Sequence, residues 1–195
     1  MIKGLDETAL SFFHLVEEAD AGDLVGQQSL PVDIGDDAAS MYQKMIDAGR
    51  EMIREYYPKF EQGVVPRTPQ EDEKATWWPR RRPEHGIIDW TRSVRDVYNW
   101  IRGQTRPYPG AFSYIDGQKV TIWDANPPNE HTAFVRPGEI SYQDDDSLGV
   151  GVWESTIEIT ELQIKGDEPV TGGEFLEVYK FKTGDQFRNS VDQRR

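Results

Sequence analysis

The longest periodic pattern in the sequence runs from Ala38 to about Phe60 and is typical of an amphipathic helix. Its apolar residues recur at steps of three and four positions: Ala38, Met41, Tyr42, Met45, Ile46, Gly49, Met52, Ile53, Tyr56 and Phe60. Such steps place side chains along one side of a helix. Asp36 and Asp37 carry the charge that favours a helix start, and Gly63 ends the helix. We interpret the stripe as core, and its methionines as packing residues rather than as a plastic binding surface.

Two apolar, β-prone segments precede this helix and are separated by a short acidic turn. Thr8–Val16 and Leu24–Val32 are predicted to be strands. The turn between them contains Asp20 close to Gly22. A carboxylate held there by two strands can orient an imidazole or accept a proton. The alternative is an ordinary Asp/Gly turn, because these residues favour turns for purely local reasons.

A stretch rich in aromatic and basic residues follows the helix. Trp77 and Trp78 stand just before the run Arg80–Arg82. Guanidinium groups pair with phosphate and indole rings stack on bases, so this stretch can be read as a nucleotide or RNA contact. The alternative, which the composition favours, is a connecting strap whose rings fill the seam between two lobes. Its arginines would then pair with nearby carboxylates, Glu84 and Asp89.

The second half of the chain contains one predicted helix followed by a run of short strands. The helix covers residues 94–104, with Thr91 or Ser93 as its cap, and Pro107 stops it. Asp116-Gly117 is predicted to be a hairpin turn. The predicted strands cover residues 112–115, 118–123, 138–142, 148–153, 156–164 and 174–179. Short strands at this spacing predict a small β-barrel of OB-like character.

Composition narrows the classes of function. The net charge of −13 disfavours binding to a phosphate backbone, and the chain has no cysteine for a disulfide, a thiol nucleophile or a metal. No apolar run is long enough to cross a membrane and no secretory leader is evident, so we expect a cytoplasmic protein. The run Asp144–Asp146 lacks the ligand spacing of a calcium loop and is predicted to be a solvated turn. His85 and His131 are expected to be exposed rather than catalytic.

Three short motifs occur in order along the chain. The first is Glu7-Thr8-Ala9-Leu10-Ser11, followed by Asp20-Ala21-Gly22-Asp23. The second is Arg82-Pro83-Glu84-His85-Gly86-Ile87-Ile88-Asp89-Trp90, and the third joins Ile101-Arg102 to Arg106-Pro107-Tyr108-Pro109-Gly110-Ala111-Phe112. Together they resemble the formyltransferases that use 10-formyltetrahydrofolate, a family that includes methionyl-tRNA formyltransferase and the sugar-nucleotide N-formyltransferases. The resemblance is specific over residues 4–125 and loose over the β-rich remainder.

The resemblance implies an acyl-transfer site. Asp20 matches the family's catalytic aspartate, which orients a histidine. The residues implied to contact the two substrates are Ala19, Ala21 and Gly22 for the folate co-substrate 10-formyltetrahydrofolate, and Arg82 and Tyr108 for the acceptor. Some positions depart from the family pattern: Ala9 replaces a glycine, Ser11 replaces a threonine, and Phe13 stands where a sugar-directed relative has histidine. His14 is one position away and does not match the family's catalytic histidine.

The resemblance also implies a fold and a division of the chain. Residues 1–63 are expected to be an α/β remnant of a formyltransferase Rossmann-like domain, consisting of two strands and a long helix. A linker strap and helix follow over 64–106, then the OB-like β-barrel over 107–188 and a frayed tail over 189–195.

In the family, an Asn-x-His pair and an H-x-S-L-L-P-x-Y-R-G loop lie upstream of the Thr8 region. We therefore expect this chain to be the C-terminal part of a longer enzyme, with little or no turnover alone. The acidic C-terminal region favours a nucleotide-linked amino sugar or another small amine as the acceptor, and disfavours tRNA. A methionyl-tRNA formyltransferase and a non-catalytic binding module remain alternatives. No membrane partner is expected, and the oligomeric state is left open.

Overall fold

The computed structural model describes residues 1–71, 73, 75–129, 135–153 and 155–190. The chain contacts divide it into two compact units. We call Leu5–Asp33 with Ser40–Arg80 the hairpin unit, and Met1–Gly4, Ile34–Ala39 and Arg81–Arg195 the sheet unit. None of the helices in the described ranges is long and apolar enough to span a bilayer.

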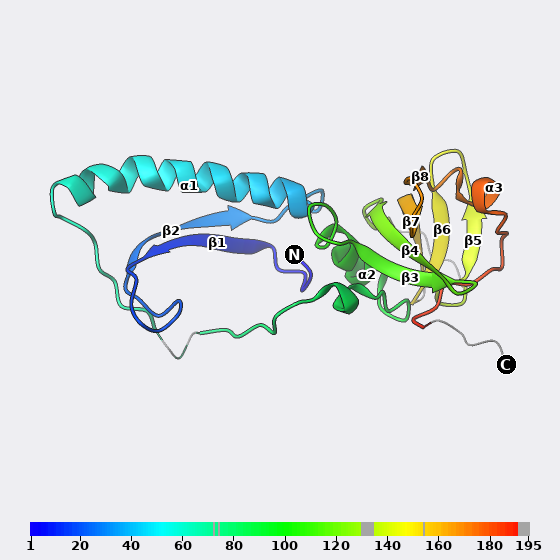
Figure 1. Cartoon of the computed structure of the whole chain (residues 1–195), viewed down its shortest axis with the longest axis horizontal. Helices are drawn as coiled ribbons and strands as arrows, with labels where there is room; N and C mark the ends of the chain where they lie inside the picture. The colour runs from blue at the N-terminus through cyan, green and yellow to red at the C-terminus, as the bar shows by residue number, and fades with distance from the viewer. Residues whose placement is uncertain (72, 74, 130–134, 154, 191–195) are drawn as a thin grey trace. The chain divides into compact units, whose positions relative to one another are not determined.

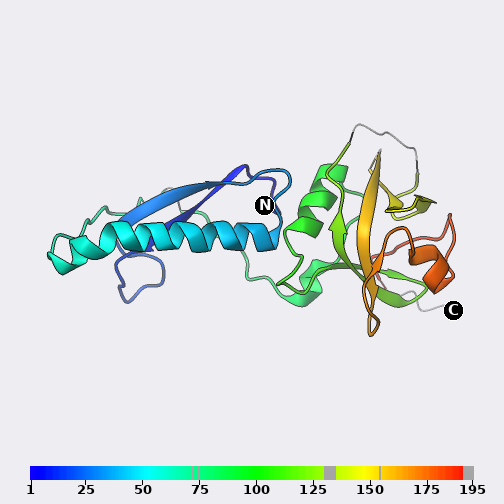
Figure 2. The same ribbon diagram turned by 90° about the horizontal axis from the view of Figure 1, so that it is seen from above.

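The hairpin unit is built from a two-stranded antiparallel sheet and a long helix. Strand β1 (Glu7–Phe13) pairs with β2 (Leu24–Pro31) in a register that places Thr8 opposite Leu30. Helix α1 (Ala38–Glu61) runs along this hairpin (Figures 1 and 2). Both strands and the helix confirm the sequence prediction. Strand β1 ends earlier than predicted because the chain turns after Phe13, leaving Leu15 and Val16 exposed.

One stripe of α1 packs against the hairpin. Met41, Ala48 and Met52 are buried, as is Leu30 of β2. Polar contacts reinforce this packing, since Lys44 Nζ donates to the Pro31 carbonyl at 3.1 Å. These residues form the small core of the unit.

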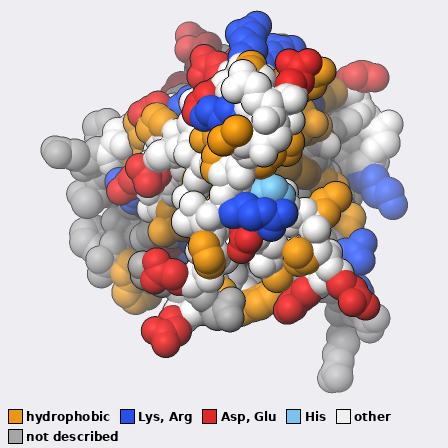
Figure 3. Space-filling model, turned by 90° about the vertical axis from the view of Figure 1, so that its left-hand side faces the viewer, with side chains coloured by type: hydrophobic (Ala, Val, Ile, Leu, Met, Phe, Trp, Pro, Cys, Tyr) orange, Lys and Arg blue, Asp and Glu red, His pale blue; other side chains and the backbone are white. Residues whose placement is uncertain are grey.

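A neighbouring apolar stripe of α1 stays at the surface. Tyr42, Ile53, Tyr57 and Phe60 are between 49% and 59% exposed. On the face shown in Figure 3, hydrophobic side chains lie at the surface among acidic and basic ones. The core interpretation of the apolar pattern is therefore correct for only one of its two sides. Exposed apolar side chains along one side of a helix promote association.

Replacing Ile53 by glutamate is expected to reduce self-association of the purified polypeptide, because it interrupts this exposed stripe with a charge. Light scattering as a function of concentration measures the effect, with circular dichroism confirming that helix content is retained. Arg54→Glu is the matched control, since Arg54 lies on the polar side of the helix and its replacement makes the net charge still more negative. An equal reduction in both variants would attribute the effect to net charge and not to the stripe.

The sheet unit contains the other helices and strands whose bounds lie within the described residues. They are the short 3₁₀ helix η2 (Pro83–Gly86), α2 (Val94–Arg102), β3 (Ala111–Ile115), β4 (Gln118–Ala125), β5 (Ile140–Gln143), β6 (Leu148–Val152), β7 (Ser155–Ile164), β8 (Val170–Thr171) and α3 (Phe175–Tyr179). Ser93 caps α2 by accepting a hydrogen bond from the Asp96 amide at 3.1 Å. Asp116 and Gly117 both have positive φ angles, as the predicted hairpin turn requires.

The strands form one antiparallel sheet in the order β3-β4-β7-β6-β5, with β8 paired to β7. Val97 and Ile101 of α2 are fully buried, in a hydrophobic core that they share with side chains of the strands. The pairings among the described strands leave the sheet open between β3 and β5. A C-terminal segment makes main-chain hydrogen bonds near both edges, from Arg188 to Tyr114 at 2.7 Å and from Ile140 to Asp185 at 2.9 Å.

The strand predicted over residues 174–179 is wrong, because Phe175–Tyr179 forms helix α3. The rings of Phe175 and Tyr179 lie 5.3 Å apart, a separation that one helical turn permits and an extended chain does not. Gln143 Oε1 accepts a hydrogen bond from the Leu176 amide and so stabilises the start of the helix. The segment 169–173, predicted to be a connection, contributes β8.

Candidate functional site

The acidic turn between β1 and β2 folds back on itself. The His14 amide donates to the Asp23 carbonyl at 2.9 Å, which closes the loop at its base. Gly22 is buried so closely against the main chain of His14 that a Cβ would collide with the His14 carbonyl oxygen. Asp20 adopts φ 60°, a left-handed conformation that aspartate tolerates better than most residues. Such a conformation is often retained at functional sites.

A second segment, far away in sequence, holds this loop in place. Gln70 Nε2 donates to the carbonyl oxygens of both Asp20 and Gly22 at 2.7 Å. Arg67 pairs with the Asp23 carboxylate at 3.2 Å. The His14 ring donates from Nε2 to the Pro66 carbonyl at 3.0 Å, since a carbonyl only accepts. Hydrogen bonds and one ion pair with residues 66–70 therefore support the loop.

The Asp20 side chain is exposed at the surface of this supported loop. Within the described parts of the chain its carboxylate has no hydrogen-bond or ion-pair partner, and Ala19 and Ala21 beside it are exposed. The imidazole of His14 is engaged with Pro66. The carboxylate is thus held in position by its main chain and remains available to a group that approaches the loop.

The other two predicted site residues, Arg82 and Tyr108, line one cavity of the sheet unit. Its volume is about 490 Å³. The lining residues are Ile2, Arg81, Arg82, Pro83, Gly103, Gln104, Tyr108, Pro109 and Gly110. The structure therefore brings together residues from the second and third sequence motifs, whereas the acidic turn belongs to the hairpin unit.

The two arginines of this cavity have different surroundings. Arg81 donates from Nη2 to Gln104 Oε1 at 2.6 Å, and its guanidinium lies 4.4 Å from the centre of the Trp100 ring. Burial lowers the pKa of Arg81 from its usual value. Arg82 is two-thirds exposed and approaches the Glu84 carboxylate only to 3.8 Å. Arg81 is therefore a fixed part of the wall, and Arg82 offers a charge to a ligand.

Tyr108 provides an aromatic surface beside these charges. Its ring is about half exposed, and its hydroxyl has no hydrogen-bond partner among the described residues. The main chain is held by a hydrogen bond from the Tyr108 amide to the Thr105 carbonyl at 3.0 Å. Guanidinium groups, a phenol and an apolar floor together suit a ligand that has both a planar ring and an anionic group.

The structure describes the residues of the aromatic and basic stretch. Trp77 and Trp78 are exposed, at 86% and 61%. Of the two carboxylates that the strap interpretation assigns to the arginines, Glu84 lies 3.8 Å from Arg82, whereas Asp89 pairs with Arg92. His85 is exposed, and its Nδ1 accepts a hydrogen bond from the Arg82 amide. His131 lies outside the described residues.

Sequence reasoning missed the residues that support both sites. Gln70, Arg67 and Gln104 carry no motif, and each acts through a contact with a distant segment. In the sequence, Arg81 differs in no way from the other arginines of its basic run. The Asp144–Asp146 run forms the turn between β5 and β6, where Asp144 accepts hydrogen bonds from the following main chain. Among the described residues no group of three or more potential metal ligands is found.

Comparison with known proteins gives the family. The sequence model of the formyl transferase C-terminal domain matches residues 81–180, a little over half of the chain. A methionyl-tRNA formyltransferase of Lactiplantibacillus plantarum is 30% identical over 193 residues, which cover 97% of this chain and 61% of that protein. This chain therefore spans less than two thirds of the curated relative.

Solved structures agree with this assignment. HypX from Aquifex aeolicus, in a complex with tetrahydrofolic acid, is 26% identical with a TM-score of 0.70, over 90% of this chain and 32% of HypX. An N-formyltransferase from Helicobacter canadensis, in a complex with folinic acid and dTDP-3-aminofucose, shares the fold at 15% identity, with a TM-score of 0.64 over 81% of this chain and 57% of that one. With the domain match and the three motifs, these similarities establish that the chain belongs to the formyl transferase family.

Proposed function

We propose that this chain takes part in the transfer of a formyl group from 10-formyltetrahydrofolate to a primary amine. The amine attacks the formyl carbon, a tetrahedral oxyanion forms, and a proton leaves the nitrogen. The tetrahedral intermediate then collapses, the bond between the formyl carbon and N10 of the folate breaks, and tetrahydrofolate leaves with a proton on that nitrogen. The observation that carries this proposal is the exposed carboxylate of Asp20, on a loop that Gln70 holds through two hydrogen bonds.

In this proposal Asp20 orients a histidine and stabilises the positive charge that the histidine gains with the proton. The neighbouring residues Ala19, Ala21 and Gly22 contact the folate. Gly22 supports this role because a side chain there would displace the loop from the His14 main chain. Small, exposed neighbours on both sides of Asp20 leave room for a flat ligand.

We propose a nucleotide-linked amino sugar as the acceptor, bound at the cavity of the sheet unit. Arg82 would pair with a phosphate, and the Tyr108 ring would stack on the base. Acidic side chains on the strands of the sheet unit support a small acceptor, because Asp124 of β4 is exposed and Glu158 of β7 is half-buried.

Methionyl-tRNA is the second candidate acceptor. It is supported by the curated relative, which is a methionyl-tRNA formyltransferase at 30% identity. A non-catalytic binding module is less well supported, because such a module is expected to have a covered or polar surface, whereas one stripe of α1 is exposed and apolar.

We further propose that the strands of the sheet unit form an OB-like barrel. The barrel would occupy residues 107–188, after the Rossmann-like remnant over 1–63 and the linker over 64–106, and before the tail over 189–195. The support is the segment Asp185–Arg188, whose main-chain hydrogen bonds reach Tyr114 of β3 on one side and Ile140 of β5 on the other. Phe187 in this segment is buried beside Trp90, with ring centres 5.6 Å apart.

A formyl-transfer assay tests the reaction and the acceptor together. Release of tetrahydrofolate is followed with this polypeptide alone, and with the same polypeptide joined to the part of the Lactiplantibacillus plantarum relative that it does not span. We expect the joined protein to formylate a dTDP-linked amino sugar faster than methionyl-tRNA, and the polypeptide alone to be slow. Preference for methionyl-tRNA would overturn the acceptor, and failure with every amine in a folded joined protein would overturn the reaction.

A further inference from the structure

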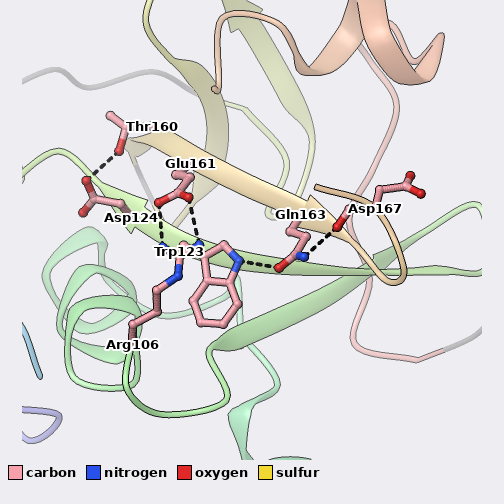
Figure 4. Close-up of polar contacts among 7 residues, drawn as sticks. All are labelled: Arg106, Trp123, Asp124, Thr160, Glu161, Gln163 and Asp167. Atoms are coloured by element: carbon pink, nitrogen blue, oxygen red, sulfur yellow. Dashed lines mark hydrogen bonds and ion pairs between the residues drawn. The ribbon is translucent and has the colours of Figure 1, made fainter. Parts of the chain in front are cut away.

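One wall of the cavity is a short loop, residues 106–110, which is anchored on the sheet at both of its ends. At its start, Arg106 forms two parallel hydrogen bonds with the Glu161 carboxylate of β7, each 2.9 Å long (Figure 4). At its end, Gly110 has φ +86° and packs so closely on β4 that a Cβ would collide with Thr121 and crowd Trp123. Tyr108 and Pro109, which face the cavity, lie between these anchors.

Trp123 joins the two anchors into one network. The Arg106 guanidinium lies 4.2 Å from the centre of the Trp123 ring, so it is held by the ring and by the Glu161 carboxylate at once. Trp123 Nε1 donates to Gln163 Oε1 at 2.8 Å, and Gln163 Nε2 donates to the Asp167 carbonyl at 2.7 Å (Figure 4). The network therefore fixes the plane of the indole on which both ends of the loop rest.

The Arg106–Glu161 ion pair fixes the relative orientation of its two side chains. A guanidinium and a carboxylate that meet in two parallel hydrogen bonds define an orientation as well as a distance. The contact with Glu161 raises the pKa of Arg106. Both side chains are only partly exposed, at 48% and 34%. A lysine at 106 or a glutamine at 161 keeps the bulk but cannot reproduce this paired geometry.

We propose that Glu161 is a positioning residue for acceptor binding, which acts through Arg106 to place the Tyr108 ring over the cavity. This inference rests on the proposed function for the identity of the ligand. Glu161 itself does not line the cavity, so its effect on binding must pass through the loop. Through Glu161, the sheet thereby sets the geometry of a cavity that residues of the second and third motifs line.

The experiment uses Glu161→Gln, with Glu161→Asp as the conservative variant and Arg106→Lys as a second route to the same broken pair. Glu139→Gln is the matched control, because Glu139 pairs with Arg136 in the same unit, away from this cavity, and the change in charge is identical. Tyrosine-selective ring labelling reports on Tyr108 by NMR without any ligand, and Tyr108→Phe assigns its resonance. The dissociation constant for dTDP is measured in parallel.

We expect Glu161→Gln and Arg106→Lys to shift or broaden the Tyr108 resonance and to weaken dTDP binding about five- to tenfold. Glu161→Asp should recover part of the loss, and Glu139→Gln should change neither readout. An unchanged Tyr108 resonance in both pair-breaking variants would overturn the positioning role. If Tyr108 responds but dTDP binds to no variant, including the parent, the positioning role stands and the proposed acceptor fails.

A second result would also overturn the proposal. In it, Glu161→Gln and Glu139→Gln lose dTDP binding to the same extent, and each loss parallels a fall in melting temperature. It would show that the effect is general destabilisation of the unit and not the placement of Tyr108.

Discussion

Replacing Arg102 by methionine is expected to lower the free energy of unfolding of the sheet unit by about 3 kcal/mol. Arg102 is buried at the end of α2, where its Nη1 donates to the carbonyl oxygens of Ile34 at 3.2 Å and Asp36 at 2.7 Å. Its Nε donates to Asn99 Oδ1 at 2.9 Å. Methionine keeps the apolar stem but removes the Arg102 donors of the Asp36 carbonyl and of Asn99 Oδ1, whereas the Ile34 carbonyl keeps its hydrogen bond from the Tyr98 hydroxyl. Each buried group left unsatisfied costs roughly 1–3 kcal/mol.

Urea unfolding followed by tryptophan fluorescence measures this loss, because Trp90 is buried in the same unit. Arg92→Met is the matched control. Arg92 is two-thirds exposed in its pair with Asp89, so its loss is expected to cost less than about 1 kcal/mol. Arg102→Lys should fall between the two, since it retains the charge without the planar fork. Equal stability of Arg102→Met and Arg92→Met would show that the buried contacts contribute little.

Replacing Asp20 by asparagine is expected to reduce kcat for formyl transfer about 10²–10⁴-fold in the joined protein of the transfer assay, if Asp20 orients the histidine as proposed. Asparagine has nearly the same shape, and the contacts that hold the loop are made by the main-chain oxygen of Asp20 and not by its carboxylate. The substitution should therefore remove the charge while leaving the loop and the stability of the hairpin unit unchanged. Stopped assays of tetrahydrofolate release give kcat and KM separately.

Asp23→Asn is the control for this measurement. It removes an equal charge from the same loop, and its carboxylate faces Arg67 at 3.2 Å. We expect only a small change in kcat, because the loop keeps its main-chain contacts with Gln70. If Asp20→Asn retained the parent kcat, or if Asp23→Asn lost as much, Asp20 would not be the orienting carboxylate.

Local patterns in the sequence were sufficient to predict the elements that form from nearby residues. The apolar steps between Ala38 and Phe60 predict α1, and two apolar, β-prone segments on either side of a turn predict the β1–β2 hairpin. The pair Asp116-Gly117 predicts its own turn, because both residues accept positive φ angles. The same reasoning failed at Phe175–Tyr179, because a short apolar segment is compatible with a strand as well as with a single helical turn.

The motifs identify the candidate site residues, and the packing of the folded chain sets the surroundings of each one. Arg82 and Tyr108 lie in separate motifs, and only the folded sheet unit brings them to one cavity. Gln70 reaches Asp20 across 50 residues, and Glu161 reaches Arg106 across 55. Such contacts leave no local period in the sequence, because they depend on which segments the fold packs together. The family motifs and most of the regular elements therefore follow from local sequence, whereas the support of each candidate site arises only when distant segments meet.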